Sequence, residues 1–288
     1  MKSLLMMVAL LPWLWCGWAA AEPAAETAPE MYRDAACGQV LVRCTADGVP
    51  LLLLLDTGAT HTVIDAEVAA QKLPKAYRVD TTGMDIRGNA AGVRPEILLL
   101  ALEAGEKNFP QQPVLVMPLG GVRAMLREPV DGILGMDVLC RLAYTLDFRE
   151  GGQSHWGAED SPTARPMPAR PDAGGCPLLS LRCGEKVIPR VLLDTGSSST
   201  VLAPDDWPAG EGAQREVQVA DVNGHRTVQL RFGSPAAVQL AEGIQAQVRP
   251  QLSEGVNRSS CSGILGVDAL RGLRLIYRPD RGFGLIPE

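Results

Sequence analysis

Two aspartates, each followed by Thr-Gly, are the residues of this sequence whose type and spacing could do chemistry. Asp56-Thr57-Gly58 and Asp194-Thr195-Gly196 each follow an apolar run, and β-branched residues resume a few positions later. Glycine allows a tight turn, so each aspartate is expected where a buried strand bends. Two neighbouring carboxyls cannot both ionise comfortably, so they share one proton and supply an acid and a base together. Such a pair could hydrolyse a peptide bond without a metal or a cofactor.

A second pair of matched segments follows the first pair in the same order. Residues 131–137 spell Asp-Gly-Ile-Leu-Gly-Met-Asp, and residues 262–268 spell Ser-Gly-Ile-Leu-Gly-Val-Asp. Ile133 lies 77 residues after Asp56, and Ile264 lies 70 residues after Asp194. These repeats indicate an internal duplication with one aspartate in each copy. Asp131, Asp137 and Asp268 also lie in these segments, where turns or helix caps explain them.

The paired motifs resemble those of the aspartic peptidases, and the resemblance covers about residues 37–150 and 176–288. It implies a mainly β, bilobal acid-protease fold, in which two similar retropepsin-like β-barrel lobes bring the aspartates together above the two Ile-Leu-Gly segments. The lobes, of about 113 residues, are smaller than pepsin-like lobes. Pepsin-like enzymes as a rule carry a tyrosine near the tip of a hairpin flap, and no tyrosine lies near either hairpin tip expected here. The chain therefore looks like two retropepsin lobes fused in one chain, similar to bacterial envelope aspartyl proteases.

The elements that must position the aspartates are two hairpins and the segments after them. Strands are expected at residues 39–43 and 50–55 in the first lobe, and at residues 178–182 and 187–193 in the second. Asp65 is expected to cap a short helix that runs through Leu73 and ends at Pro74. Residues 118–129 are expected to form a loop.

The resemblance also implies roles for the residues beside the aspartates. Thr57 and Thr195 would bond across the lobe interface, although β-propensity alone could explain a threonine there, and Gly58 and Gly196 would let the backbones approach. Ala59 follows the first motif, whereas Ser197 follows the second and could donate its hydroxyl to Asp194, favouring the charged form. Asp194 is thus predicted to be the ionised member of the dyad and Asp56 the protonated one.

Two hairpin tips are expected at Gly88-Asn89 and at Asn223-Gly224. They lie 32 and 29 residues after their aspartates, where the resemblance places a flap over a cleft. Asn-Gly is a strong hairpin signal, but turn chemistry alone also fits two ordinary surface hairpins. His61 is expected either to line the cleft or to face solvent.

The first residues indicate export. Lys2, an apolar run and Ala19-Ala20-Ala21 make residues 1–21 a signal peptide, which predicts a periplasmic or cell-envelope location. An uncleaved N-terminal membrane anchor is the alternative, but the apolar run is short for a span. Residues 22–36 are Ala/Pro/Glu-rich and are expected to form a disordered lead-in. Residues 151–175 are expected to link a first lobe at 37–150 to a second at 176–288.

Cysteines and charge restrict the remaining possibilities. The predicted mature chain has an even number of cysteines, which in an exported protein favours disulfides and no more than two free thiols. The spacing of Cys and His fits no zinc site, so no metal is expected. A formal net charge of -6 and the absence of a basic stripe argue against nucleic acid as a partner.

The sequence thus predicts an exported aspartic endopeptidase that cuts extended polypeptides, needs no cofactor and has no membrane span after signal cleavage. It is expected to be a monomer with an intramolecular dyad of Asp56 and Asp194. One alternative is a catalytically silent peptide-binding module of the same fold, which would not need both Asp-Thr-Gly motifs. The other is a structural envelope protein in which each lobe pairs with a copy in another chain.

Overall fold

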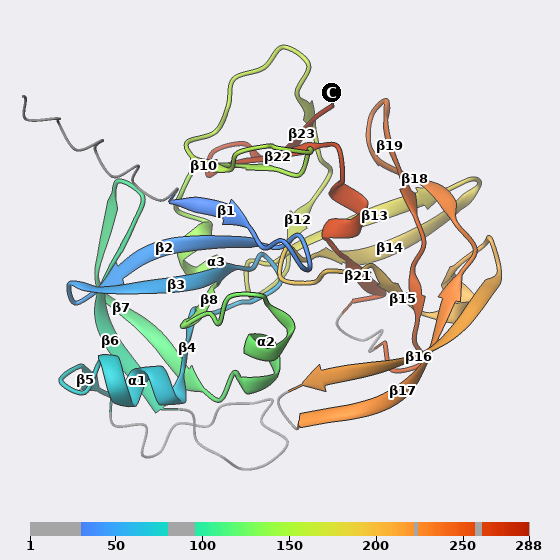
Figure 1. The fold of residues 1–288 in the computed structure, drawn as a ribbon. Helices are drawn as coiled ribbons and strands as arrows, with labels where there is room; N and C mark the ends of the chain where they lie inside the picture. The colour runs from blue at the N-terminus through green and yellow to red at the C-terminus, as the bar shows by residue number, and fades with distance from the viewer. Residues whose placement is uncertain (1–29, 80–95, 222–223, 257–260, 288) are drawn as a thin grey trace, which may run out of the picture.

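The computed structural model describes residues 30–79, 96–221, 224–256 and 261–287, and it is mainly β with two lobes (Figure 1). The expected signal peptide, most of the lead-in and part of each expected flap therefore lie outside the described residues. No helix among the described residues is long and apolar enough to cross a membrane.

The first lobe is an eight-stranded sheet in the order β1-β2-β3-β8-β4-β7-β6-β5. An additional pairing of β2 with β6 closes six of these strands into a barrel. Three short helices lie between the strands. The elements are β1 (Met31–Arg33), β2 (Val40–Ala46), β3 (Val49–Leu55), β4 (Val63–Asp65), α1 (Ala66–Lys72), β5 (Tyr77–Arg78), β6 (Glu96–Ala104), β7 (Lys107–Met117), α2 (Gly120–Met125), β8 (Gly132–Leu134) and α3 (Met136–Leu139).

The second lobe repeats the central arrangement of the first. In the first lobe β8 lies between β3, to which it is parallel, and β4, to which it is antiparallel; β21 lies in the same way between β14 and β15. The duplication expected from the motifs is thus a duplication of topology. The elements are β12 (Arg170–Pro171), β13 (Pro177–Cys183), β14 (Lys186–Leu193), β15 (Val201–Leu202), η1 (Pro204–Asp206), β16 (Glu211–Asp221), β17 (Gly224–Gly233), β18 (Ala236–Ala241), β19 (Ile244–Val248), β20 (Gln251–Leu252), β21 (Gly263–Leu265) and η2 (Val267–Leu270).

A third sheet joins the lobes and lies at the top of the molecule in Figure 1. Its central pairing runs between β9, which follows the first barrel, and β22, near the end of the chain. Tyr144 of β9 stacks on Tyr277 of β22, with ring centroids 5.2 Å apart. The strands, in sheet order, are β10 (His155–Trp156), β9 (Tyr144–Asp147), β22 (Arg274–Arg278), β23 (Gly282–Ile286) and β11 (Arg165–Pro166).

The leucine run of β3 explains how the first aspartate is held in place. Alternate side chains of a strand face opposite sides, and Leu53 and Leu55 are buried in the main core. Leu54 faces the other way, into a small cluster with Leu41, Leu126 and Val130. Because both faces of β3 are covered, its sequence is continuously apolar. The strand is therefore rigid up to the residue before Asp56.

The expected helix cap is confirmed, whereas three segments expected to lack regular structure contain a helix or strands. Asp65 caps α1, since its Oδ1 accepts from the amides of Glu67 and Val68. The predicted loop at residues 118–129 contains α2. Within the predicted disordered lead-in 22–36, β1 pairs with β2 and Met31 is buried. The predicted linker 151–175 adds β10, β11 and β12 to the sheets, because backbone pairing needs no apolar periodicity.

The expectation of disulfides, with no more than two free thiols, is wrong for this structure. All six described cysteines are free: Cys37, Cys44, Cys140, Cys176, Cys183 and Cys261. Cys44 and Cys183 are core residues, where a thiol packs as a small apolar group. Cys37 Sγ donates to Asp34 Oδ1 at 3.1 Å. The paired spacing of the cysteines thus reflects the duplicated strands and not bridge formation.

Candidate active site

The two aspartates lie at equivalent ends of β3 and β14. The amide of Asp56 donates to Leu134 O at 3.1 Å, and the amide of Asp194 donates to Leu265 O at 3.0 Å. Each Ile-Leu-Gly segment therefore fixes the backbone of the aspartate beside it. This single chain brings both carboxyls together, and they hydrogen-bond to each other.

Backbone amides support each carboxylate. Asp56 Oδ1 accepts from the amides of Gly58 at 2.7 Å and Ala59 at 3.0 Å. Asp194 Oδ1 accepts from the amide of Gly196 at 2.9 Å. These donors are preorganised by the turn that follows each aspartate, so they need no rearrangement to stabilise negative charge.

Thr57 and Thr195 form reciprocal hydrogen bonds across the lobe boundary, as the resemblance implied. Each Oγ1 accepts from the amide of the other threonine at 3.1 Å. Each also donates to the carbonyl that precedes the opposite aspartate: Thr57 to Leu193 O at 2.7 Å, and Thr195 to Leu55 O at 2.8 Å. Both side chains are fully buried. Four bonds therefore fix the two strand ends relative to each other.

Gly58 and Gly196 are required by close approach. A Cβ on Gly58 would lie 2.5 Å from Cγ of Asp194, and one on Gly196 would lie 2.4 Å from Cγ of Asp56. Because these atoms belong to the paired carboxyls, any side chain there would separate the aspartates. The glycine of each motif makes room for the acid of the other.

Burial raises the pKa of both carboxyls, and the environment makes them unequal. The pKa of Asp194 lies well above its ordinary value, first because of burial and then because of the charge of Asp56. The pKa of Asp56 is raised by burial, while its bonds to Asp194 and to the amides of Gly58, Ala59 and Gly196 oppose the increase. One proton is therefore shared, and the larger number of amides that donate to Asp56 favours the proton on Asp194.

This assignment corrects the prediction that Asp194 is the ionised member. That prediction placed the Ser197 hydroxyl on Asp194, but Ser197 Oγ donates instead to Ser199 O at 2.8 Å. The acceptor of this hydroxyl is set by the fold of the turn, which the sequence does not reveal. Asp56 Oδ1 accepts from two amides and Asp194 Oδ1 from one, which favours Asp56 as the ionised member of the dyad.

Comparison with known proteins agrees with this geometry in the first lobe. Residues 42–138 match the family model described as aspartyl protease. Over these residues the first lobe is similar to the aspartyl proteases. None of the curated proteins compared with the chain matches it.

The two lobes together share their fold with a seed protein. Conglutin gamma, a basic 7S globulin from lupine seeds, is 12% identical, and the similarity covers 90% of this chain and 94% of that one with a TM-score of 0.53. Basic 7S globulin from soybean is also 12% identical, covering 89% and 93% of the two chains with a TM-score of 0.47. At this identity the lupine match establishes the bilobal fold alone.

A duplicated threonine–aspartate pair supports each loop that carries a dyad aspartate, and sequence reasoning missed it. Asp137 Oδ1 accepts from the amide of Thr62 at 2.9 Å and from its hydroxyl at 2.8 Å, and Asp268 Oδ1 accepts from the hydroxyl of Thr200 at 2.8 Å. The same hydroxyls accept from the amides of Gly135 and Gly266. Each threonine lies six residues after its motif aspartate, a repeat that could have revealed the pair.

The remaining predicted site residues have varied positions. Gly88, Asn89 and Asn223 lie outside the described residues, whereas Gly224 starts β17 and pairs with Asp221 of β16. The β16–β17 hairpin therefore forms where it was expected, and it contacts α2 of the opposite lobe. His61 is exposed, and its Nδ1 lies 2.8 Å from Thr60 Oγ1. No group of three His, Cys, Asp or Glu in the described ranges could hold a metal ion.

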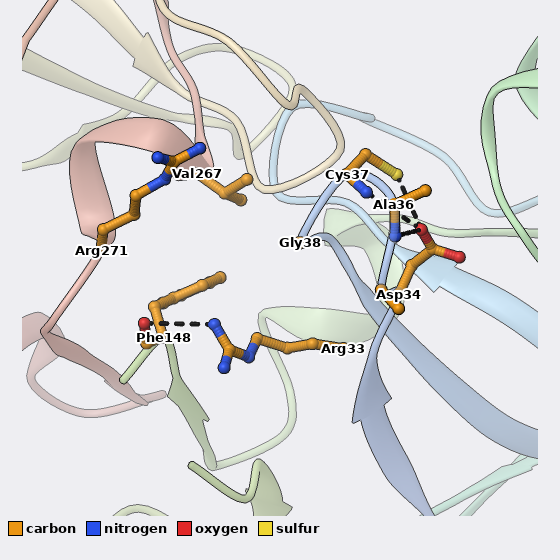
Figure 2. Close-up of a pocket in the computed structure, with 9 residues that line it drawn as sticks. Arg33, Asp34, Ala36, Cys37, Gly38, Phe148, Val267 and Arg271 are labelled. Carbon is orange, nitrogen blue, oxygen red and sulfur yellow. Dashed lines mark hydrogen bonds between the residues drawn. The ribbon is translucent and has the colours of Figure 1, made fainter. Parts of the chain in front are cut away.

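A cavity of about 450 Å³ lies between the lobes, and neither Asp56 nor Asp194 lines it. Figure 2 shows Arg33 on one side of it, bonded to Phe148 O, and Arg271 on the other. Its third wall is the loop at residues 34–38, where Asp34 Oδ1 accepts from the amides of Ala36 and Cys37. This loop leads directly into Gln39, whose side chain reaches the Asp194 loop.

Proposed function

We propose that the protein is an aspartic endopeptidase, which hydrolyses peptide bonds of extended polypeptides with Asp56, Asp194 and an activated water. The observation that carries the proposal is the pair of hydrogen-bonded carboxyls, both with raised pKa and both supported by amides. A pair that holds one proton contains a base and an acid in contact, as peptide hydrolysis requires.

The roles follow from the asymmetry of the pair. Ionised Asp56 accepts a proton from water as the water oxygen attacks the carbonyl carbon of the substrate. Asp194 donates its proton to the carbonyl oxygen, so the tetrahedral intermediate forms without a separated charge. Asp56 then gives its proton to the leaving nitrogen. A hydroxyl of the intermediate returns its proton to Asp194 as the carbonyl re-forms and the C–N bond breaks, so the pair again holds one proton.

The β16–β17 hairpin supports an extended substrate. It spans from the second lobe to α2 of the first, and β16 is the terminal strand of its sheet. An edge strand can pair with an extended peptide through main-chain hydrogen bonds, which recognises a stretched polypeptide irrespective of its sequence. The expected flap at Gly88-Asn89 would act from the opposite lobe.

Location and assembly belong to the same proposal. The apolar run and alanines of residues 1–21 support export to the periplasm or cell envelope, with the enzyme working as a monomer. A polypeptide is the proposed partner, and nucleic acid is not.

The alternative is a silent peptide-binding module. The lupine protein of similar fold is described as a seed globulin, so this fold is not by itself evidence of peptidase activity. An unfolded protein incubated with the purified chain separates the two functions: an endopeptidase produces fragments, and a hydroxyl-bearing transition-state mimic stops it. Binding without fragments would favour the module.

The dyad is tested by neutralising one acid at a time. Asp56→Asn and Asp194→Asn should each reduce kcat at least about 1,000-fold, because a single carboxyl cannot be base and acid together. Fragment release is measured beside circular dichroism, with exposed Asp280→Asn as the matched control. Substantial activity in either folded variant would exclude the single dyad.

A further inference from the structure

Two side chains outside the Asp-Thr-Gly motifs reach across the lobe boundary to the loops that carry the dyad. Gln39, which precedes β2 of the first lobe, donates from Nε2 to Gly196 O in the second lobe. Cys176, which precedes β13 of the second lobe, donates from Sγ to Gly58 O in the first lobe at 3.5 Å. The two side chains are 3% and 2% exposed, respectively. Each contact therefore ends, in a buried place, on the glycine of the opposite motif.

Each of these carbonyls belongs to a peptide unit whose amide supports a dyad carboxyl. The carbonyl of Gly58 shares its peptide unit with the amide of Ala59, which donates to Asp56 Oδ1 at 3.0 Å. The carbonyl of Gly196 shares its unit with the amide of Ser197, which donates to the main-chain carbonyl of Asp194 at 3.3 Å and lowers the pKa of the Asp194 side chain. A hydrogen bond accepted by a carbonyl polarises the peptide and strengthens its N–H as a donor. The chain thus contains two relays, each running from a side chain through one peptide to a carboxyl.

We propose that Gln39 and Cys176 are positioning residues of the dyad, each fixing the orientation and the donor strength of one amide that supports an aspartate. The inference rests on the proposed function for its catalytic meaning, whereas the relays themselves are a property of the folded chain. An amide N–H is a stronger donor than a thiol, so the two relays differ in strength. Gln39 acts on Asp194, and Cys176 acts on Asp56.

The thiol is available as a donor throughout the neutral range. Burial, and then the charges of Asp172, Asp56 and Asp194, raise the pKa of Cys176 to about 12. The two dyad acids act on each other, and Asp172 acts with them on the thiol. The Gln39 side chain is uncharged, and the Cys176 thiol stays neutral. A change in the titration of the dyad after substitution of Gln39 or Cys176 would therefore not arise from a lost neighbouring charge.

Two substitutions change the relays in opposite senses. Gln39→Met keeps the length of the side chain but removes the donor, so the Ser197 amide weakens and the upper pKa of the dyad rises. Cys176→Ser replaces a weak donor with a stronger one, so the Ala59 amide strengthens and the lower pKa of the dyad falls. We expect shifts of about 0.2 to 0.5 pH unit in these opposite directions.

The titration is followed by ¹³C NMR of labelled aspartate carboxyls in the full chain, which requires no activity. Cys183→Ser is the matched control, because it makes the same change at a cysteine in the core and should leave both dyad pKa values unchanged. The pH profile of kcat/KM on one peptide should move with the NMR values.

Unchanged dyad titration in folded Gln39→Met, or shifts in the same direction in both variants, would overturn the relays. If Gln39→Met does not fold, Cys176→Ser decides alone. The inference is then refuted if the lower of the two dyad pKa values stays the same or rises in Cys176→Ser. A parent protein that cuts no peptide while its carboxyls respond as expected would refute the proposed function and leave the relays established.

Discussion

At the scale of single residues, the dyad is a place where the fold works against ionisation. Burial raises the pKa of both carboxyls, and the charge of Asp56 raises that of Asp194 further. The backbone amides oppose this rise in pKa. The four threonine bonds hold the acids together despite the cost. Marginal overall stability makes such a local cost measurable.

The free energy of unfolding should therefore depend on pH in a way that reports the dyad. A group whose pKa is raised by folding contributes stability that is fully present below its unfolded pKa, about 3.9 for Asp, and that is lost as pH rises through the folded value. Between the unfolded and the folded pKa, the free energy of unfolding of the parent should fall with rising pH by up to about 1.4 kcal/mol per pH unit relative to Asp194→Asn. The variant has no such proton to release.

Urea unfolding of the parent and of Asp194→Asn between about pH 4 and 8 measures this difference. Asp280→Asn, an exposed aspartate near the end of the chain, is the control and should follow the parent. Parallel curves for the parent and Asp194→Asn would show that the folded protein does not hold the extra proton.

At the scale of elements, each acid is carried by a strand end, and each strand end is fixed by the neighbouring Ile-Leu-Gly strand. Asp137 and Asp268 complete this unit by holding the threonine six residues after the dyad acid. The first copy is further stabilised by Asp131, whose Oδ2 accepts from the amide of Leu52 in β3 and whose carboxylate pairs with Lys72. These three acids are thus structural residues of the loops.

Thr62→Val tests how much the hydrogen bonds of the Thr62 hydroxyl stabilise the loop that carries Asp56. The substitution keeps the β-branched shape but leaves the Asp137 carboxylate and the Gly135 amide without the hydroxyl, at a cost of about 1 to 3 kcal/mol. Since a Cβ on Gly135 would lie 2.6 Å from His61 O and 3.0 Å from Ala59 O, the loop beside Asp56 is packed on this segment, and kcat should also fall.

Denaturant unfolding beside peptidase assays tests this, with Thr45→Val as control. The hydroxyl of Thr45 donates to Glu103 near the surface, so its loss should change stability by less than about 0.5 kcal/mol. Equal effects of the two substitutions would mean that the bond between buried Thr62 and Asp137 has no special role.

The sequence predicted those elements whose local chemistry and tertiary role agree. The strand before each aspartate, the Asp65 cap and the hairpin of β16 and β17 are of this kind. It did not predict α2, because Gly120 and Gly121 at its start are poor helix formers. It could not predict that the Ser197 hydroxyl donates to Ser199 O. Nor could it predict the hydrogen bond of Gln39, whose partner Gly196 lies 157 residues away.

At the scale of the whole molecule, the third sheet makes the two lobes one unit. β9 pairs with β22 over four residues, and β10 and β11 from the intervening segment extend the same sheet on both sides. Tyr277 contacts both Tyr144 and Phe283, with centroids 5.2 and 4.6 Å apart. Together with the threonine bonds, this sheet favours pairing of the two lobes within a chain over pairing between chains.

Mixing two inactive variants distinguishes these arrangements. If lobes pair between chains, Asp56→Asn and Asp194→Asn together can assemble a dyad with two intact aspartates, and the mixture recovers activity. We expect none, because both acids of each dyad come from one chain, and the specific activity of the parent should stay constant on dilution. Unfolding and refolding the mixture before the assay gives exchange every opportunity, and a parent sample treated alone shows how much activity survives refolding. Recovery in the mixture, or loss of specific activity on dilution, would instead support a protein whose lobes pair with copies in other chains.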